Sequence, residues 1–324
     1  GMSRASSNLV PDALRSGNRR ALAKAITLLE SSRSQDQAAA QQLLETLLPD
    51  SGNALRLGIT GVPGVGKSTF IEAFGLHLIE QGRRVAVLAV DPTSPVAGGS
   101  ILGDKTRMPE LSRHPDAFVR PSPSSGILGG VARRTRETLL LCEAAGYDVV
   151  LVETVGVGQS ETLVASMVDC FLVLLLPNAG DELQGIKKGI LEAADLLVVN
   201  KTDGEQVALA KSTQQAYRQA LRLVRSEVSG GALSVLTCSA LEGSGLDLVW
   251  QAVQAFEQHA RHSGVWERQR KTQARQWLWT LVEEGLLREF RSRPDMQSQL
   301  QDCEQAVSDG TLLPTQAAEQ LLGY

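Results

Sequence analysis

Short apolar runs alternate with longer stretches of helical periodicity between residues 54 and 256 of this 324-residue chain. The runs occupy residues 55–60, 84–90, 149–152, 170–176, 196–199 and 234–237. Most are continuous, which is typical of strands buried on both faces, because successive strand residues point to opposite sides of a sheet. The pattern predicts an α/β fold with a mostly parallel central sheet flanked by helices, and ligands at the carboxyl ends of the strands.

Helical periodicity without strand-like runs marks both ends of the chain. Apolar residues recur at helical spacing across residues 12–48, and a polar stretch at 31–34 divides them into a predicted helical hairpin. Residues 265–322 show the same periodicity. About 60 residues of amphipathic helix form only a small core on their own. This segment is therefore expected to pack on a second copy of the chain, or alternatively on its own sheet.

These patterns divide the chain into four parts. Residues 1–9 are polar and are expected to lack regular structure, with Gly1 as the remnant of a tag. Residues 10–52 form an N-terminal helical segment and residues 53–262 form the sheet domain. Residues 263–324 are expected to form a C-terminal helical dimerisation arm.

Composition narrows the classes of partner. The net charge of −4 offers no basic face for a nucleic acid. No apolar stretch reaches the roughly 18 residues of a membrane span, and residues 1–20 lack the apolar core of a signal peptide. The four cysteines are scattered without a CxxC pair, so we expect reduced thiols and a cytoplasmic protein.

Residues 61–68 read GVPGVGKS, which fits the phosphate-loop pattern GxxxxGK[ST] and lies between a predicted strand and an apolar helix. The glycines allow successive backbone amides to face phosphates, and the start of the helix adds the positive end of its dipole. Lys67 is expected to reach the β- and γ-phosphates, and the Ser68 hydroxyl to ligate Mg²⁺. The predicted phosphate-binding residues are Gly61, Val62, Pro63, Gly64, Val65, Gly66, Lys67, Ser68 and Thr69.

Three acidic residues are candidate Mg²⁺ ligands, directly or through water: Asp91, Asp104 and Glu153. Any one of them alone is often a helix cap or a solvated residue, but three of them, two directly at predicted strand ends, favour metal binding. Residues 153–156, ETVG, resemble the DxxG element of GTPases with Glu in place of Asp, and the Gly156 amide is expected to sense the γ-phosphate. Lys67, Glu153 and Gly156 are therefore the candidate catalytic residues.

Asn200, Lys201 and Asp203 belong to the sequence NKTD, which follows a predicted strand. The Asp203 carboxylate is expected to accept hydrogen bonds from guanine N1–H and the exocyclic amine, donors that adenine does not offer there. Lys201 is expected to lie over the base plane while Asn200 braces the loops. The backbone of Ser239, Ala240 and Leu241 is the candidate contact for guanine O6. The predicted ligand is GTP, or GDP after hydrolysis, with Mg²⁺.

Together, GVPGVGKST, AVDPTSPVAGGSILGDKTRM, ETVGVGQSE, GDELQGIKKG and NKTD resemble the methylmalonyl-CoA mutase-associated GTPases, from about residue 12 to the end of the chain. These are P-loop GTPases of the metallochaperone type, also described as arginine/ornithine (LAO/AO) transport kinases. The resemblance implies a homodimeric P-loop NTPase that escorts adenosylcobalamin-dependent methylmalonyl-CoA mutase. It also implies that the protein gates B12 loading and protects or reactivates the mutase, which accelerates GTP hydrolysis.

The resemblance further assigns roles to segments. Residues 91–107 would be switch I, residues 153–161 switch II, and residues 177–187 a third switch that communicates with the mutase. Ser68, Asp91, Asp104 and Glu153 would form the metal and phosphate-sensing set, and Asp181, Gln184 and Lys187 the partner-coupling set. The third switch begins Pro177-Asn178, where proline fixes φ and removes a donor, so its mobility is expected to differ.

Several points stay open. No residue is an obvious base for the attacking water, so a slow free enzyme is expected, and Lys105, Arg107 or Lys187 would either add positive charge on partner binding or remain solvated. The alternatives are a kinase or ATPase linked to arginine/ornithine transport, against which NKTD argues, and a nickel or cobalt metallochaperone, against which the lack of CxxC argues. The mutase that the protein escorts could alternatively be another acyl-CoA mutase, of the isobutyryl or ethylmalonyl type. We expect the chain itself not to hold cobalamin tightly.

Overall fold

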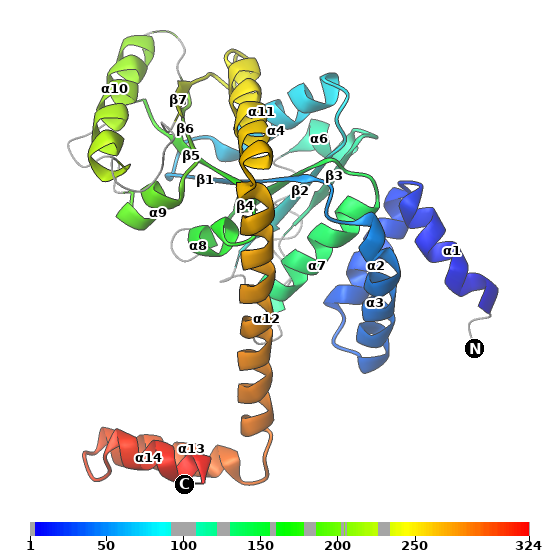
Figure 1. The fold of residues 1–324 in the computed structure, drawn as a ribbon, viewed down its shortest axis with the longest axis vertical. Helices are drawn as coiled ribbons and strands as arrows, with labels where there is room; N and C mark the ends of the chain where they lie inside the picture. The colour runs from blue at the N-terminus through cyan, green and yellow to red at the C-terminus, as the bar shows by residue number, and fades with distance from the viewer. Residues whose placement is uncertain are drawn as a thin grey trace. The chain divides into compact units, whose positions relative to one another are not determined.

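The computed structural model describes residues 4–91, 108–121, 130–155, 160–177, 186–201, 204, 206–225 and 234–323. Within these residues, seven parallel strands form one sheet in the order β3-β2-β4-β1-β5-β6-β7 (Figure 1). The strands are β1 Leu55–Gly61, β2 Val85–Val90, β3 Ala117–Arg120, β4 Val149–Thr154, β5 Cys170–Leu175, β6 Leu196–Val199 and β7 Ser234–Thr237. The predicted α/β class with a parallel sheet is confirmed.

Helices cover both faces of this sheet, which explains the continuous apolar runs. One core forms against α4 Lys67–Glu80, α6 Pro109–Arg113 and α11 Leu246–Ser263. The other forms against α2 Arg19–Glu30, α3 Ser34–Leu47, α7 Gly130–Ala144, α8 Ser160–Ala165, α9 Lys188–Ala193 and α10 Gln206–Arg225. On β1, Leu57 and Ile59 belong to the first core. Gly58 faces the second, where a Cβ would lie 2.8 Å from Val164 Cγ1, so glycine lets α8 pack close to the sheet.

Six of the seven strands coincide with the predicted apolar runs, whereas β3 was not predicted. β3 has only four residues, lies at the edge of the sheet and pairs with β2 alone. Only its first two residues are buried. A short edge strand therefore leaves no continuous apolar run in the sequence.

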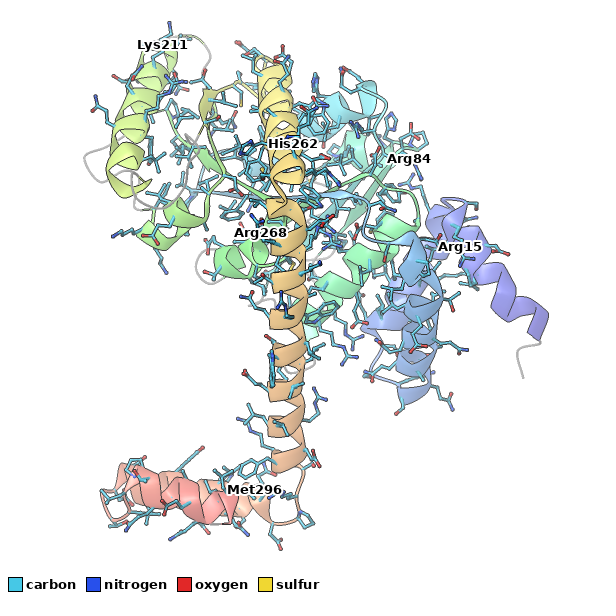
Figure 2. All side chains as sticks on the ribbon, in the orientation of Figure 1. Arg15, Arg84, Lys211, His262, Arg268 and Met296 are labelled. Atoms are coloured by element: carbon cyan, nitrogen blue, oxygen red, sulfur yellow. The ribbon has the colours of Figure 1, made fainter. Side chains whose placement is uncertain are left out.

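The N-terminal helices form the expected hairpin, since α2 and α3 flank the predicted break near residues 31–33. Asn18 caps α2, its side chain accepting from Ala21 N at 3.0 Å. A further helix, α1 Arg4–Arg15, begins inside the polar segment that we expected to lack regular structure. Arg15, labelled in Figure 2, donates from Nε to Asp50 Oδ2 at 2.8 Å and so links α1 to the short 3₁₀ turn η1 Leu48–Asp50.

The chain divides into two compact units, Gly1–Glu267 and Arg268–Tyr324. Helix α12 Val265–Arg291 continues from the first unit into the second, which also contains α13 Met296–Ser308 and α14 Pro314–Leu322. The described residues of the second unit form helices joined by short turns. None of the described helices combines the length and the apolar character that crossing a membrane requires.

Candidate nucleotide site

The phosphate loop connects β1 to α4, and α4 begins at Lys67 directly after Gly66. Gly64 and Gly66 have φ angles of +81° and +78°, which residues with a side chain rarely adopt. A Cβ on Gly61 would lie 2.7 Å from Val65 Cγ1, so any side chain there would force Val65 to move. The glycines thus permit a backbone path that ends at a helix N-terminus, where unpaired amides and the helix dipole favour a phosphate.

Asn200 ties this loop to two others. Its side chain is 2% exposed, its Nδ2 donates to Val65 O at 2.9 Å, and its Oδ1 accepts from Ala240 N at 3.1 Å. Cys238 Sγ also donates to Oδ1, at 3.6 Å. Burial raises the pKa of this thiol to about 12, which keeps it protonated and able to donate at neutral pH. One buried amide therefore connects the phosphate loop, the start of NKTD and the loop after β7.

Lys201 extends along the phosphate loop. Its backbone has φ +67°, and its Nζ donates to Gly64 O at 2.5 Å. A Cβ on Gly66 would lie 3.3 Å from Lys201 Cε, so the aliphatic part of the lysine lies against that glycine. Asp203 lies outside the described residues.

The loop after β7 is closed by paired backbone hydrogen bonds. Ser239 N donates to Ser244 O at 2.9 Å, and Ser244 N donates to Ser239 O at 3.0 Å. A Cβ on Gly245 would lie 2.7 Å from Thr237 O, so only glycine fits at that closure. Ser239 is fully buried whereas Leu241 projects into solvent. The backbone of residues 239–241 is thereby held in a fixed turn beside Asn200.

Three of the four candidate metal ligands lie at or just beyond the carboxyl ends of the neighbouring strands β2, β4 and β1. Glu153 on β4 stands opposite Ile59 of β1 and Ala89 of β2 in the strand register. Asp91 follows the last residue of β2, and Ser68 is the second residue of α4, which follows β1. Hydroxyl and carboxylate oxygens are the ligands that Mg²⁺ prefers, so this donor set fits that ion. Asp104 lies outside the described residues.

Thr154 joins the phosphate loop to the ETVG segment. Lys67 Nζ donates to the Thr154 carbonyl oxygen. The Thr154 and Thr60 hydroxyls share a hydrogen bond of 2.7 Å, and Val155 N donates to Val90 O at 2.9 Å. This threonine pair was not predicted from the sequence. The sequence shows only that a threonine stands near the end of each of two apolar runs. The pair could not be predicted from this, because it forms only if β1 and β4 are neighbours in the sheet.

Replacing Thr60 by valine is expected to lower the free energy of unfolding by about 1–3 kcal/mol, because it leaves the buried Thr154 hydroxyl without this partner. The Thr60→Val/Thr154→Val double variant is expected to lose less than the sum of the two single variants. Urea unfolding of all three variants measures this. Strictly additive losses would show that the two hydroxyls do not interact.

The remaining candidates are only partly placed. Lys187 is exposed and directly precedes α9, and the Pro177 carbonyl accepts a hydrogen bond from Thr213 Oγ1 of α10. Gly156, Asp181, Gln184, Lys105 and Arg107 lie outside the described residues. Within the described part, no three His, Cys, Asp or Glu side chains come together as a metal-holding group.

A phosphate loop after the first strand of a parallel sheet, joined through an asparagine to an NKTD loop at another strand end, defines a P-loop nucleotide-binding protein. The sequence profile described as "Methylmalonyl Co-A mutase-associated GTPase MeaB" matches residues 22–295. The chain belongs to this family and is a GTPase.

Similar proteins agree with this assignment. The chain is 51% identical over 308 residues to GTPase ArgK of Escherichia coli, covering 95% of this chain and 93% of ArgK. It is 48% identical over 316 residues to the mitochondrial "Methylmalonic aciduria type A homolog" of Mus musculus, covering 94% and 76%. The crystal structure of a protein named LAO/AO transport system kinase superposes with a TM-score of 0.81 at 43% identity, covering 100% of this chain and 98% of that one.

Proposed function

We propose that this GTPase is a chaperone of an adenosylcobalamin-dependent methylmalonyl-CoA mutase, gating B12 loading and protecting or reactivating the mutase. The observation that carries guanine-nucleotide binding is the Asn200 link between the phosphate loop, NKTD and the loop after β7. The mutase is proposed from the family's description and from a relative named for methylmalonic aciduria.

The proposed roles rest on the sequence motifs and, for residues in the described part of the chain, also on their positions. Lys67 and the phosphate-loop amides would neutralise the γ-phosphate, and the Gly156 amide, at the end of the ETVG segment that begins at Glu153, would sense it. Ser68, Asp91, Asp104 and Glu153 would hold Mg²⁺, which when bound stabilises charge developing on the phosphate oxygens. The P-loop set Gly61 to Thr69, with Asn200, Lys201, Asp203 and the 239–241 turn, would hold the nucleotide. Asp181, Gln184 and Lys187 would couple the site to the mutase.

Replacing Asp203 by asparagine is expected to weaken GTP binding at least about 100-fold and to favour xanthosine triphosphate. Asparagine presents an amide donor where guanine also donates, whereas xanthine carries a carbonyl oxygen there that accepts. Fluorescence titration with both nucleotides measures the switch. Unchanged GTP affinity would remove Asp203 from the base site.

A homodimer is proposed through the exposed face of α12. Trp279, Val282 and Leu286 are all exposed, with Trp279 62% and Leu286 61% accessible. Their spacing of three and then four residues places them on one stripe of the helix, the arrangement that pairs helices in coiled coils. A Cβ placed on the neighbouring Gly285 would meet no atom within 4 Å, which leaves room for a close approach.

Size-exclusion chromatography with purified methylmalonyl-CoA mutase tests the partnership. A complex that forms with a slowly hydrolysed GTP analogue and differs in affinity with GDP is the expected result, since a switch must distinguish the two nucleotides. Absence of a complex in both nucleotide states would contradict the mutase assignment. Transfer of the γ-phosphate to a protein acceptor rather than to water would favour the transport-kinase alternative.

A further inference from the structure

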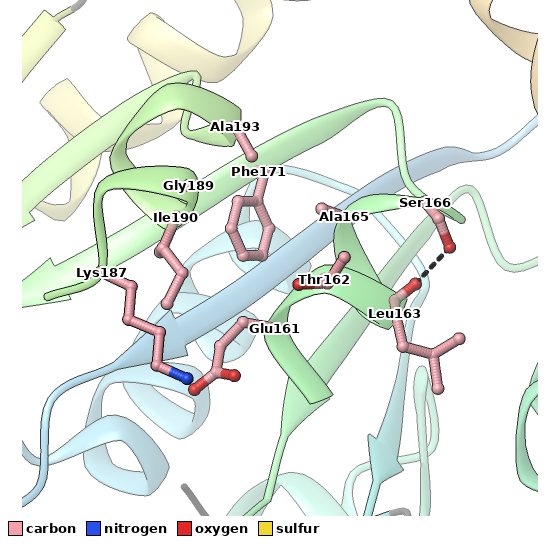
Figure 3. Close-up of a pocket in the computed structure, with 10 residues that line it drawn as sticks. All are labelled: Glu161, Thr162, Leu163, Ala165, Ser166, Phe171, Lys187, Gly189, Ile190 and Ala193. Carbon is pink, nitrogen blue, oxygen red and sulfur yellow. Dashed lines mark hydrogen bonds between the residues drawn. The ribbon is translucent and has the colours of Figure 1, made fainter. Parts of the chain in front are cut away.

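A cavity of ≈ 760 Å³ opens between α8 and α9 on the side of the sheet away from α4 (Figure 3). Its walls are mostly apolar, with Leu163 on one side, Ile190 and Ala193 on the other, and Phe171 of β5 between them. The volume lies within the range of about 300–1,000 Å³ that is typical of binding pockets. None of these residues belongs to the nucleotide site.

The described part of the helical layer is thin at this place. Helices α8 and α9 have only six residues each. Gly58 draws α8 close to β1, since a Cβ there would lie 2.8 Å from Val164 and 2.9 Å from Phe171 Cδ2. Among the residues that the structure describes, the apolar floor beside Phe171 is therefore incompletely covered.

Two charged groups face one another across the cavity. Glu161 projects from α8, and Lys187 is the residue directly before α9. Figure 3 shows the end groups of these two side chains directed toward each other. Glu161 is only 9% exposed, and its Oε2 is buried without a hydrogen-bond partner among the described residues. A buried carboxylate oxygen in apolar surroundings favours any molecule that brings it a donor. Because the Lys187 ammonium already faces it, a neutral donor fits better than a second cation.

We propose that this cavity receives an aromatic side chain with a neutral donor, tyrosine or tryptophan, from the acyl-CoA mutase. Its ring would contact Leu163, Phe171 and Ile190, and its O–H or N–H would donate to Glu161 Oε2. Such residues combine a large apolar surface with one polar end and anchor many protein interfaces. The inference rests on the proposed function, in which a mutase is the partner.

An occupied cavity would act on the GTP site through its walls. Helix α8 follows β4 and the ETVG segment, and α9 follows β5 and the proposed third switch. A partner side chain between α8 and α9 would fix the separation of these helices. It would thereby favour one arrangement of the ETVG segment and of the proposed third switch, which connect the helices to the phosphate site. The differential stability of the two arrangements is what couples partner binding to hydrolysis.

Gly189→Leu tests the proposal by filling the cavity. Gly189 lines it, and no atom lies within 4 Å of a Cβ built there, so the new side chain enters open space. The matched control is Lys188→Leu, which adds the same side chain at a neighbouring position whose side chain is 78% exposed. Gly189→Leu is expected to bind the mutase at least about tenfold more weakly, as loss of an interface anchor does. The melting temperature should be unchanged, and Lys188→Leu should behave as the wild type in both measurements.

Glu161→Gln separates the donor contact from the shape of the cavity. It keeps the side-chain shape but removes the charge, and is expected to weaken mutase binding about fivefold, since hydrogen bonds to charged groups are the stronger ones. Isothermal titration calorimetry with full-length proteins measures all four forms.

The outcomes distinguish this inference from the proposed function. If the wild type does not bind the mutase, the proposed function fails and this inference fails with it. If the wild type binds and Gly189→Leu binds equally well, the mutase remains the partner and the cavity belongs to another occupant. An equal loss in Lys188→Leu and Gly189→Leu would assign the effect to the surface of α9 and also overturn the inference.

Discussion

Lys67→Ala is expected to lower the rate of GTP hydrolysis at saturating GTP by at least about 100-fold, the usual cost of removing a preorganised charge from a phosphoryl-transfer site. Lys67 is the first residue of α4, and its Nζ reaches the Thr154 carbonyl at the start of the ETVG connection. Alanine removes both the positive charge and the hydrogen bond to the Thr154 carbonyl oxygen. Phosphate release with purified protein measures the loss.

The matched control for Lys67→Ala is Lys188→Ala, because Lys188 is an exposed lysine at the start of α9. It is expected to hydrolyse GTP at the wild-type rate. A Lys67→Ala protein that keeps its melting temperature and hydrolyses GTP within about threefold of the wild type would show that the phosphate loop is not the catalytic site.

Trp279→Glu/Leu286→Glu is expected to convert the proposed homodimer to monomers, raising the dimer dissociation constant by at least about 100-fold. Both side chains are highly exposed on the same stripe of α12, so burying them against a second copy supplies apolar area without disturbing the fold of one chain. Two carboxylates at that interface would have to be desolvated without a counter-charge. Analytical ultracentrifugation over a concentration series measures the dissociation constant.

Leu248→Glu provides the control for this interface, because Leu248 is a comparably exposed leucine on α11. It is expected to leave the oligomeric state unchanged. If the wild type sediments as a monomer, the dimer proposal is wrong. If the α12 double variant remains a dimer, the chains associate through another surface.

The sequence predicted the parts of this structure whose cause is local. Burial on both faces leaves continuous apolar runs, which located six strands, and the division between α2 and α3 follows from a polar break. The same reasoning could not find β3, because an edge strand with only two buried residues has no such signature. It also did not predict that helix α1 begins at Arg4, because the first residues of this helix are mostly polar.

In the candidate site, the phosphate loop was predictable because its residues are contiguous. The contacts that assemble the site were not, because they join distant positions. Asn200 meets Val65 across 135 positions and Ala240 across 40, and Thr60 meets Thr154 across 94. The cavity beside Glu161 depends on the short lengths of α8 and α9 and on the place of Phe171 between them, which only the packed sheet defines.

The most direct test of the proposed function is the rate of GTP hydrolysis by the wild-type protein as purified methylmalonyl-CoA mutase is added. A GTPase that serves as the chaperone of this mutase is predicted to hydrolyse GTP slowly alone and to accelerate saturably with mutase concentration. The Lys67→Ala protein should show no acceleration. A wild-type rate that stays constant up to a large excess of mutase would contradict the proposed function.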